Sequence, residues 1–192
     1  MQARKELSDE EVMLRLQAGD MECYDVLVAR FKDRLYAFIM RMVRNGQTAE
    51  DLLQETFMRL YVHRMSYRTI ARFSTWIYTI AANLVRSHMR KQNRMPLTDL
   101  ENDRDEDKPR ELPDRKRPVD EEVAGKMTVE AVREAMANLP DEFREVIILR
   151  EIEELSYEEI VQVLGVPLGT VKSRVNRARG RLKEMLRDYV GD

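Results

Sequence analysis

The stretch from residue 96 to residue 125 places the strongest constraint on the fold. It contains four prolines, dense charges of both signs and few apolar side chains. Proline interrupts helices and central strands, and a segment so poor in apolar residues cannot form a core of its own. We therefore expect a flexible linker over residues 96–127, joining a domain at 1–95 to a second domain at 128–192.

The composition favours helices in both domains. The chain has only 7 Gly against 12 Met, and hydrophobic residues make up 43% of it, which is enough for packed cores. A single cysteine, Cys23, excludes an internal disulfide and a cysteine-based zinc site within one chain. No apolar run approaches the about 18 residues of a membrane span, and the acidic N-terminus is unlike a signal peptide. We expect a cytoplasmic, all-α protein with no membrane insertion.

Capping residues divide the first domain into helices. The predicted helices cover residues 8–19, 20–42, 48–61 and 74–93, and their capping residues are Ser8, Asp20, Thr48 and Ser74. Glu11 lies three residues after Ser8, which is the spacing of a capping box. Gly46 fits the position just after the end of the second helix. Residues 62–73 are predicted to form a loop rich in Arg and Tyr.

The second domain carries a helix-turn-helix pattern. Helices are predicted over residues 126–139, 141–153, 156–164 and 167–189. Ser156 and Glu159 form a second capping box, Gly165 supplies the turn where a positive φ is needed, and Pro167 can start the next helix. A short helix, a glycine turn and a basic second helix together indicate a DNA-binding module.

The last helix has one apolar and one outward face. At 100° per residue, one stripe holds Val171, Val175, Ala178 and Leu182 and should be buried. The opposite stripe holds Gly169, Ser173, Asn176, Arg177 and Gly180, flanked by Lys172, Arg174, Arg179 and Arg181. Asn and Arg can read base edges in a major groove, while the flanking cations can reach phosphates. The free amides near Gly169 and Thr170 can bind a further phosphate.

Charge is strongly segregated along the chain. Residues 1–95 carry 16 basic and 11 acidic side chains, and residues 160–192 carry 7 and 3. Residues 96–159, between them, carry 10 basic and 21 acidic side chains. Residues 56–98 contain no acid at all. Two basic regions separated by an acidic one suggest two contacts with a single polyanion, although long helices can also carry charge simply because they face solvent.

The acid-free segment has the features of a single-strand binding surface. Its residues for this role are Tyr67, Arg68, Arg72 and Phe73 in the loop, and Trp76, Thr79, Asn83, Arg86 and Arg90 on the following helix. Aromatic rings can stack on bases while arginines neutralise the backbone. Trp76 has an alternative interpretation as a core residue, because Ile77 and Ile80 are close to it in the sequence.

The helix at 48–61 carries a different surface. Its polar face holds Glu50, Asp51, Gln54 and Glu55. Acidic residues near a helix N-terminus are favourable in themselves, which accounts for the first two but hardly for the last two. The alternative is a face that docks on another protein and is turned away from nucleic acid.

These motifs together resemble the extracytoplasmic-function group of bacterial sigma-70 factors. The resemblance rests on AEDLLQETFMRLY, FSTWIYTIAANLVRSHMRK and the helix-turn-helix segment, in this order, and covers about residues 8–94 and 128–188. It implies two helical domains, binding to core RNA polymerase through its largest and second-largest subunits, recognition of promoter DNA at two elements and help in opening the duplex. The genes implied are those of a stress or envelope response.

The resemblance also implies roles for particular residues. The face with Asp51, Gln54 and Glu55 would meet the largest polymerase subunit. The helix around Asn83 and the 62–73 loop would bind the non-template strand of the −10 element, and the last helix the −35 element. The linker would run toward the polymerase active-site channel. An anti-sigma factor is the expected inhibitory partner.

Two other classes of function were weighed. An autonomous helix-turn-helix regulator with a sensing domain would bind promoters tightly without polymerase, but it leaves the acid-free segment unexplained. An enzyme acting on nucleic acid would need catalytic residues, yet His63 and His88 lie in no metal-ligand or triad pattern. We expect no catalytic residue, no metal and no cofactor.

Overall fold

The computed structural model describes residues 6–94 and 129–187, and every regular element within these ranges is helical. The first range holds α2 (Asp9–Gln17), α3 (Glu22–Val43), α4 (Gly46–Val62), the short 3₁₀ helix η1 (Arg64–Ser66) and α5 (Phe73–Arg94). The second holds a helical segment at 129–137, α7 (Asp141–Ile147), the π-helical segment η2 (Ile148–Ile152), α8 (Tyr157–Leu164) and α9 (Leu168–Met185). The all-α expectation is confirmed, and the predicted linker lies outside the described residues.

Both predicted capping boxes are present. The Ser8 N–H donates to the Glu11 carboxylate at 2.8 Å, and the Ser8 hydroxyl accepts from the Glu11 N–H at 3.2 Å. Ser156 and Glu159 make the same reciprocal pair at 2.8 and 3.1 Å. Gly165 ends α8 with φ +66°, the left-handed conformation predicted for the turn. These local signals therefore fix the starts of α2 and α8.

Other boundaries differ from the prediction. Arg44, and not Gly46, takes the left-handed conformation after α3, and the Asn45 side chain caps α4 by accepting from the Thr48 N–H at 2.8 Å. Gly46 thus begins α4, so the helix starts two residues before Thr48. The N-cap position of α3 is Met21 rather than Asp20, and Pro167 occupies the N-cap of α9, one residue before the helix.

The predicted helix at 141–153 is divided, because α7 passes into the π-helical turn η2. This wider turn ends at Glu153, and Glu154 then takes a positive φ of 58°. A π turn re-aims the side chains that follow it. Here it directs Glu153, which is 4% exposed, into the protein interior.

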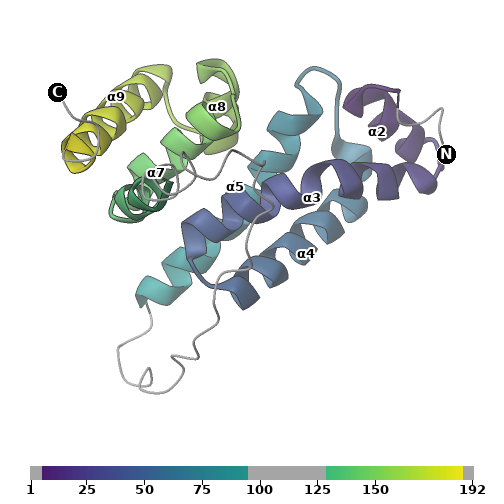
Figure 1. The fold of residues 1–192 in the computed structure, drawn as a ribbon. Helices are drawn as coiled ribbons and strands as arrows, with labels where there is room; N and C mark the ends of the chain where they lie inside the picture. Colours follow the sequence, from purple (N-terminus) through teal and green to yellow (C-terminus); the bar gives the residue numbers. More distant parts are fainter. Residues whose placement is uncertain (1–5, 95–128, 188–192) are drawn as a thin grey trace, which may run out of the picture.

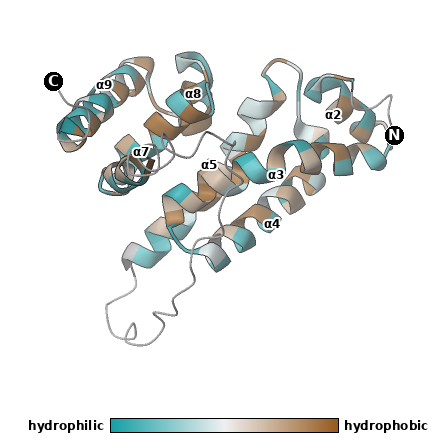
Figure 2. Cartoon of the chain, viewed as in Figure 1, coloured by the Kyte–Doolittle hydropathy of each residue, from teal (hydrophilic) through white to brown (hydrophobic). Residues whose placement is uncertain are grey.

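The first domain packs around α3 and α5. Edge-to-face ring pairs join them, with centroids 5.1 Å apart for Phe31 and Phe73 and 5.5 Å apart for Phe38 and Tyr78. α4 runs beside α3 (Figure 1). Figure 2 shows brown and teal alternating along these helices, as expected where each has one apolar side.

The two domains are in contact. Figure 1 shows α7, α8 and α9 grouped beside α3 and α5. The main contact is between α5 and α8, and the buried apolar residues of both domains form one continuous cluster. Among the described residues, no helix is both long and apolar enough to cross a bilayer.

Candidate nucleic-acid and protein interfaces

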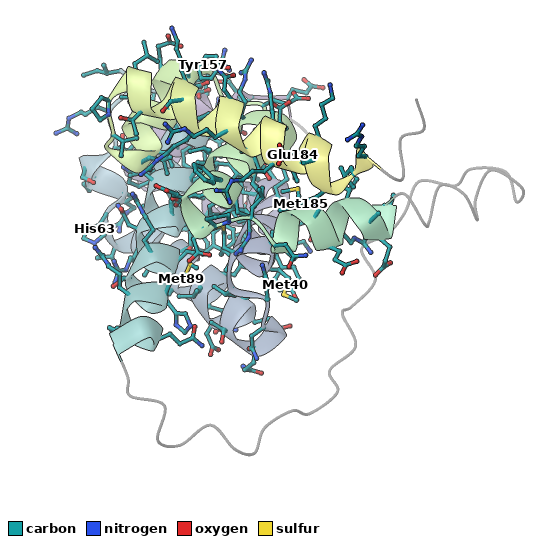
Figure 3. The ribbon with its side chains drawn as sticks, turned by 90° about the vertical axis from the view of Figure 1, so that its left-hand side faces the viewer. Met40, His63, Met89, Tyr157, Glu184 and Met185 are labelled. Carbon is teal, nitrogen blue, oxygen red and sulfur yellow. The ribbon has the colours of Figure 1, made fainter. Side chains whose placement is uncertain are left out.

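The outward face of α9 is free to meet a ligand. Val171, Val175 and Ala178 are fully buried, so the predicted apolar stripe is confirmed. Asn176 and Arg177 on the opposite side are exposed, and their side chains have no hydrogen-bond or ion-pair partner among the described residues. In Figure 3 the basic side chains of α9 project away from the other helices.

The flanking arginines of α9 already have partners in its own domain. Arg174 pairs with Glu142 at 2.6 Å, and Arg179 pairs with Glu151 at 2.6 Å. The Arg181 guanidinium lies over the Phe143 ring, 5.0 Å from its centroid. These contacts fasten α9 to α7 and η2. Sequence reasoning did not foresee them, because the acids come from helices remote in the sequence.

The loop before α5 is held in one shape by hydrogen bonds. The buried Tyr67 hydroxyl donates to the Ala71 carbonyl at 3.0 Å, and Arg68 donates to the Met65 carbonyl at 2.9 Å. The apex of the loop stays open, and Ile70 is 94% exposed. Arg68, Thr69, Ile70 and Arg72 are therefore its accessible residues.

Two aromatic residues predicted to stack on bases are buried instead. Tyr67 is 2% exposed and Phe73 is fully buried, and their ring centroids lie 5.9 Å apart. Both also contact the Trp76 ring, at 5.4 and 6.1 Å. Trp76 is partly buried against the core, which agrees with the alternative interpretation given to it. In this structure the three rings hold the loop on α5 and offer no open stacking surface.

The polar face of α5 is covered by α8, contrary to the expectation that it lies open. Arg86 donates to the Leu164 carbonyl at 2.9 Å and to the Val163 carbonyl at 3.2 Å. These carbonyls end α8 and have no partner within the helix, so a cation there is favourable. Asn83 is exposed and accepts from Arg86 at 2.8 Å, while Arg90 is exposed.

Other residues of α5 face the start of α8 or their own backbone. The Thr75 hydroxyl donates to Glu159 at 3.2 Å, and the 77%-exposed Arg72 side chain lies 3.7 Å from the same carboxylate. The Thr79 hydroxyl donates to the Thr75 carbonyl at 2.7 Å. Of the predicted residues on α5, only Asn83 and Arg90 are fully accessible.

Two buried acids lie between the domains. Glu153 accepts from the Tyr78 hydroxyl and, at 3.2 Å, from Arg34. The pKa of Tyr78 is raised, first by its own burial and then by the Glu153 charge. Glu145 is 6% exposed, with its Oε1 3.7 Å from the Arg86 Nε and without a hydrogen bond. Burial raises the pKa of Glu145 to about 7, although Arg86 and Arg174 lower it.

The acidic face of α4 borders an apolar groove. Glu50, Asp51 and Gln54 are exposed, and Glu55 pairs with Arg59 at 2.7 Å. The groove, about 800 Å³ in volume, lies between α3 and α4. Its lining residues are Met21, Tyr24, Asp25, Val28, Gln54, Phe57, Met58 and Tyr61. Sequence reasoning found the acidic face and missed the groove, since apolar residues on a helix are first assigned to its core.

Among the described residues, no group of three or more His, Cys, Asp or Glu is placed to hold a metal ion.

Comparison with known proteins finds the same family over both domains. Residues 27–95 match Sigma-70 region 2, and residues 129–182 match Sigma-70 region 4. The chain is 36% identical to the ECF RNA polymerase sigma factor SigW of Bacillus subtilis, over 91% of this chain and 94% of that protein. It is 31% identical to the ECF RNA polymerase sigma-E factor of Haemophilus influenzae, over 97% and 99%.

Solved structures show the same fold. One is the sigma factor RpoE in complex with the anti-sigma factor NepR from Bartonella quintana, with TM-score 0.66, 27% identity, and 85% of this chain and 96% of that chain covered. Another is CnrH in complex with the cytosolic domain of CnrY, with TM-score 0.68, 22% identity, and coverage of 94% and 97%.

Proposed function

The chain belongs to the extracytoplasmic-function group of sigma-70 RNA polymerase sigma factors, and we propose that its promoter contacts and its polymerase contact lie on three separate surfaces. As a member it is a transcription initiation factor, not an enzyme, and recognises promoters through regions 2 and 4. The proposed division gives the −35 element to α9, the −10 element to α5 with the preceding loop, and core polymerase to α4. Its place of action would be the cytoplasm.

The observation that carries the proposal is the outward face of α9. Asn176 and Arg177 are exposed and unpaired among the described residues, and they lie opposite a fully buried stripe. A helix that is anchored on one side and carries Asn and Arg on the other can enter a major groove with those side chains toward the bases. Lys172 and the flanking arginines would then contact phosphates, as would the helix start at Gly169 and Thr170.

The −10 surface would use the accessible apex of the loop, Arg68 to Arg72, together with Asn83 and Arg90. Arg86 can take part only after it leaves the α8 carbonyls that it now caps. Binding of the −10 strand along the whole of α5 therefore requires α8 to move away. Bases held on this surface would stay out of the duplex, which favours its opening.

Docking on polymerase would use the acidic face and the groove together. Glu50, Asp51 and Gln54 give a polar rim beside an apolar hollow, and interfaces commonly combine an apolar centre with a charged rim. A partner segment with basic and apolar side chains would fit both. In the proposal this segment belongs to the largest subunit, and the second domain meets the second-largest subunit.

We also propose regulation by an anti-sigma factor. The B. quintana relative is solved with such a partner. In this chain the contact between α5 and α8 already covers part of the −10 surface. A partner that binds and stabilises this arrangement would keep the protein from polymerase and DNA without any chemistry.

The test is promoter binding by the reconstituted holoenzyme. Arg177→Ala and Asn176→Ala should each weaken −35 readout by about 1–3 kcal/mol and relax base preference at one position. Lys183→Ala, a nearby exposed cation outside the predicted base-reading set, is the matched control and should leave base preference unchanged. If Arg177→Ala also leaves it unchanged, the groove assignment of α9 is wrong.

A further inference from the structure

Helix α2 lies outside both matched family regions, yet it contacts the loop before α5. The Gln17 amide donates to the Arg64 carbonyl at 2.7 Å and to the Tyr67 carbonyl at 3.1 Å. These two carbonyls lie at the first residue of η1 and just after its end. One side chain from α2 therefore fixes the backbone where the loop begins.

The other end of the loop is held by the same helix. The Phe73 N–H, at the first residue of α5, donates to the Glu10 carboxylate at 2.9 Å. The first amides of a helix lack intrahelical partners, and a negative charge is favourable beside them. Glu10 thus does for α5 what the predicted cap at Ser74 was expected to do, from a position 63 residues away.

α2 is itself anchored to the domain. Arg30 of α3 pairs with Asp9 at 2.5 Å and donates to the Leu7 carbonyl at 2.9 Å. On its inner side, Val12, Met13 and Leu16 are fully buried. Gln17 and Glu10 are therefore presented from a fixed support rather than from a mobile N-terminal segment.

We propose that Gln17 and Glu10 are positioning residues for −10 recognition. They clamp the loop at both ends, so that its open apex at Arg68 to Arg72 meets the DNA strand in one conformation. A loop ordered before binding loses less conformational freedom when the complex forms. This inference rests on the proposed function, which assigns the loop to the −10 element.

The test is open-complex formation by holoenzyme on promoters that differ by single −10 bases. Gln17→Met keeps the bulk of the side chain and removes both donated hydrogen bonds, and Glu10→Ala removes the acceptor at Phe73. Each should reduce the discrimination between the best and worst −10 base by about tenfold, the scale of one to two net hydrogen bonds. Glu10→Gln keeps an acceptor oxygen and should restore most of the discrimination.

Glu11→Ala is the matched control, because it breaks the capping box of the same helix without contacting the loop. It should lower the thermal midpoint and leave base discrimination unchanged. If it lowers discrimination as much as Gln17→Met does, α2 acts only through stability and the inference is overturned.

Variants of the loop apex separate the two levels of the proposal. If Arg68→Ala and Ile70→Ala alter −10 discrimination while Gln17→Met does not, the positioning role fails alone. If the apex variants also leave it unchanged, the assignment of this loop to the −10 element fails with it.

Discussion

Replacing Glu145 with glutamine should change how the stability of this protein depends on pH. The Glu145 carboxyl is buried on α7 at the contact between the domains, and its Oε1 has no hydrogen bond. The charged groups that influence it are Arg86 on α5, Arg174 on α9 and Asp141 on its own helix. Burial outweighs the two arginines and raises its pKa from 4.5 to about 7.

The direction of the effect follows from this shift. The folded protein holds a proton on Glu145 more tightly than the unfolded chain does, so the site favours folding most below about pH 4.5. The contribution falls as the pH rises and is lost above about pH 7. At about 1.4 kcal/mol for each pH unit, the full change is about 3 kcal/mol.

Glutamine resembles the neutral acid in size and cannot ionise. Glu145→Gln should therefore match the wild type near pH 4.5 and exceed it in free energy of unfolding by about 3 kcal/mol at pH 8. Urea unfolding between pH 4.5 and 8 measures the difference. Glu158→Gln, on the exposed side of α8, is the matched control and should change little across this range. A Glu145→Gln variant less stable than the wild type at pH 8 would refute the reasoning.

Three further outcomes are expected. Asp51→Arg combined with Glu55→Arg should abolish co-migration with core polymerase on gel filtration and keep the helical circular dichroism, since the only pair lost is the exposed one to Arg59, worth about 0.5 kcal/mol; unchanged co-migration would exclude this docking face. Arg181→Ala should weaken holoenzyme binding to all promoters and reduce the salt slope by about 1, whereas an altered base preference would contradict a phosphate role. In competition pull-downs, the anti-sigma partner and core polymerase should exclude each other, and a stable ternary complex would count against occlusion.

The parts of the fold set by local chemistry could be predicted. Ser8 and Ser156 each meet a glutamate three residues on, so their caps need nothing from elsewhere in the chain. The face of α9 follows from its period, since Val171 and Val175 are both fully buried. Around Gly46 two local solutions compete, and the Asn45 side chain decides between them by capping α4.

The contacts between remote segments could not be predicted. Periodicity identifies the polar face of α5 but does not say whether solvent or another helix covers it. Arg86 is buried against α8 because the free carbonyls of Val163 and Leu164 can accept from it. Tyr67 and Phe73 lie beside arginines in the sequence, yet their rings pack inward with Trp76. These outcomes depend on tertiary partners.

The division of promoter recognition between two surfaces can be tested most directly by transcription from a random promoter library. Core polymerase reconstituted with this protein should enrich templates that carry two sequence elements at a fixed spacing. With Arg177→Ala, the preference should relax at the upstream element alone, and with Arg68→Ala at the downstream element alone. Enrichment of a single element, or the same change at both elements with either variant, would contradict the account.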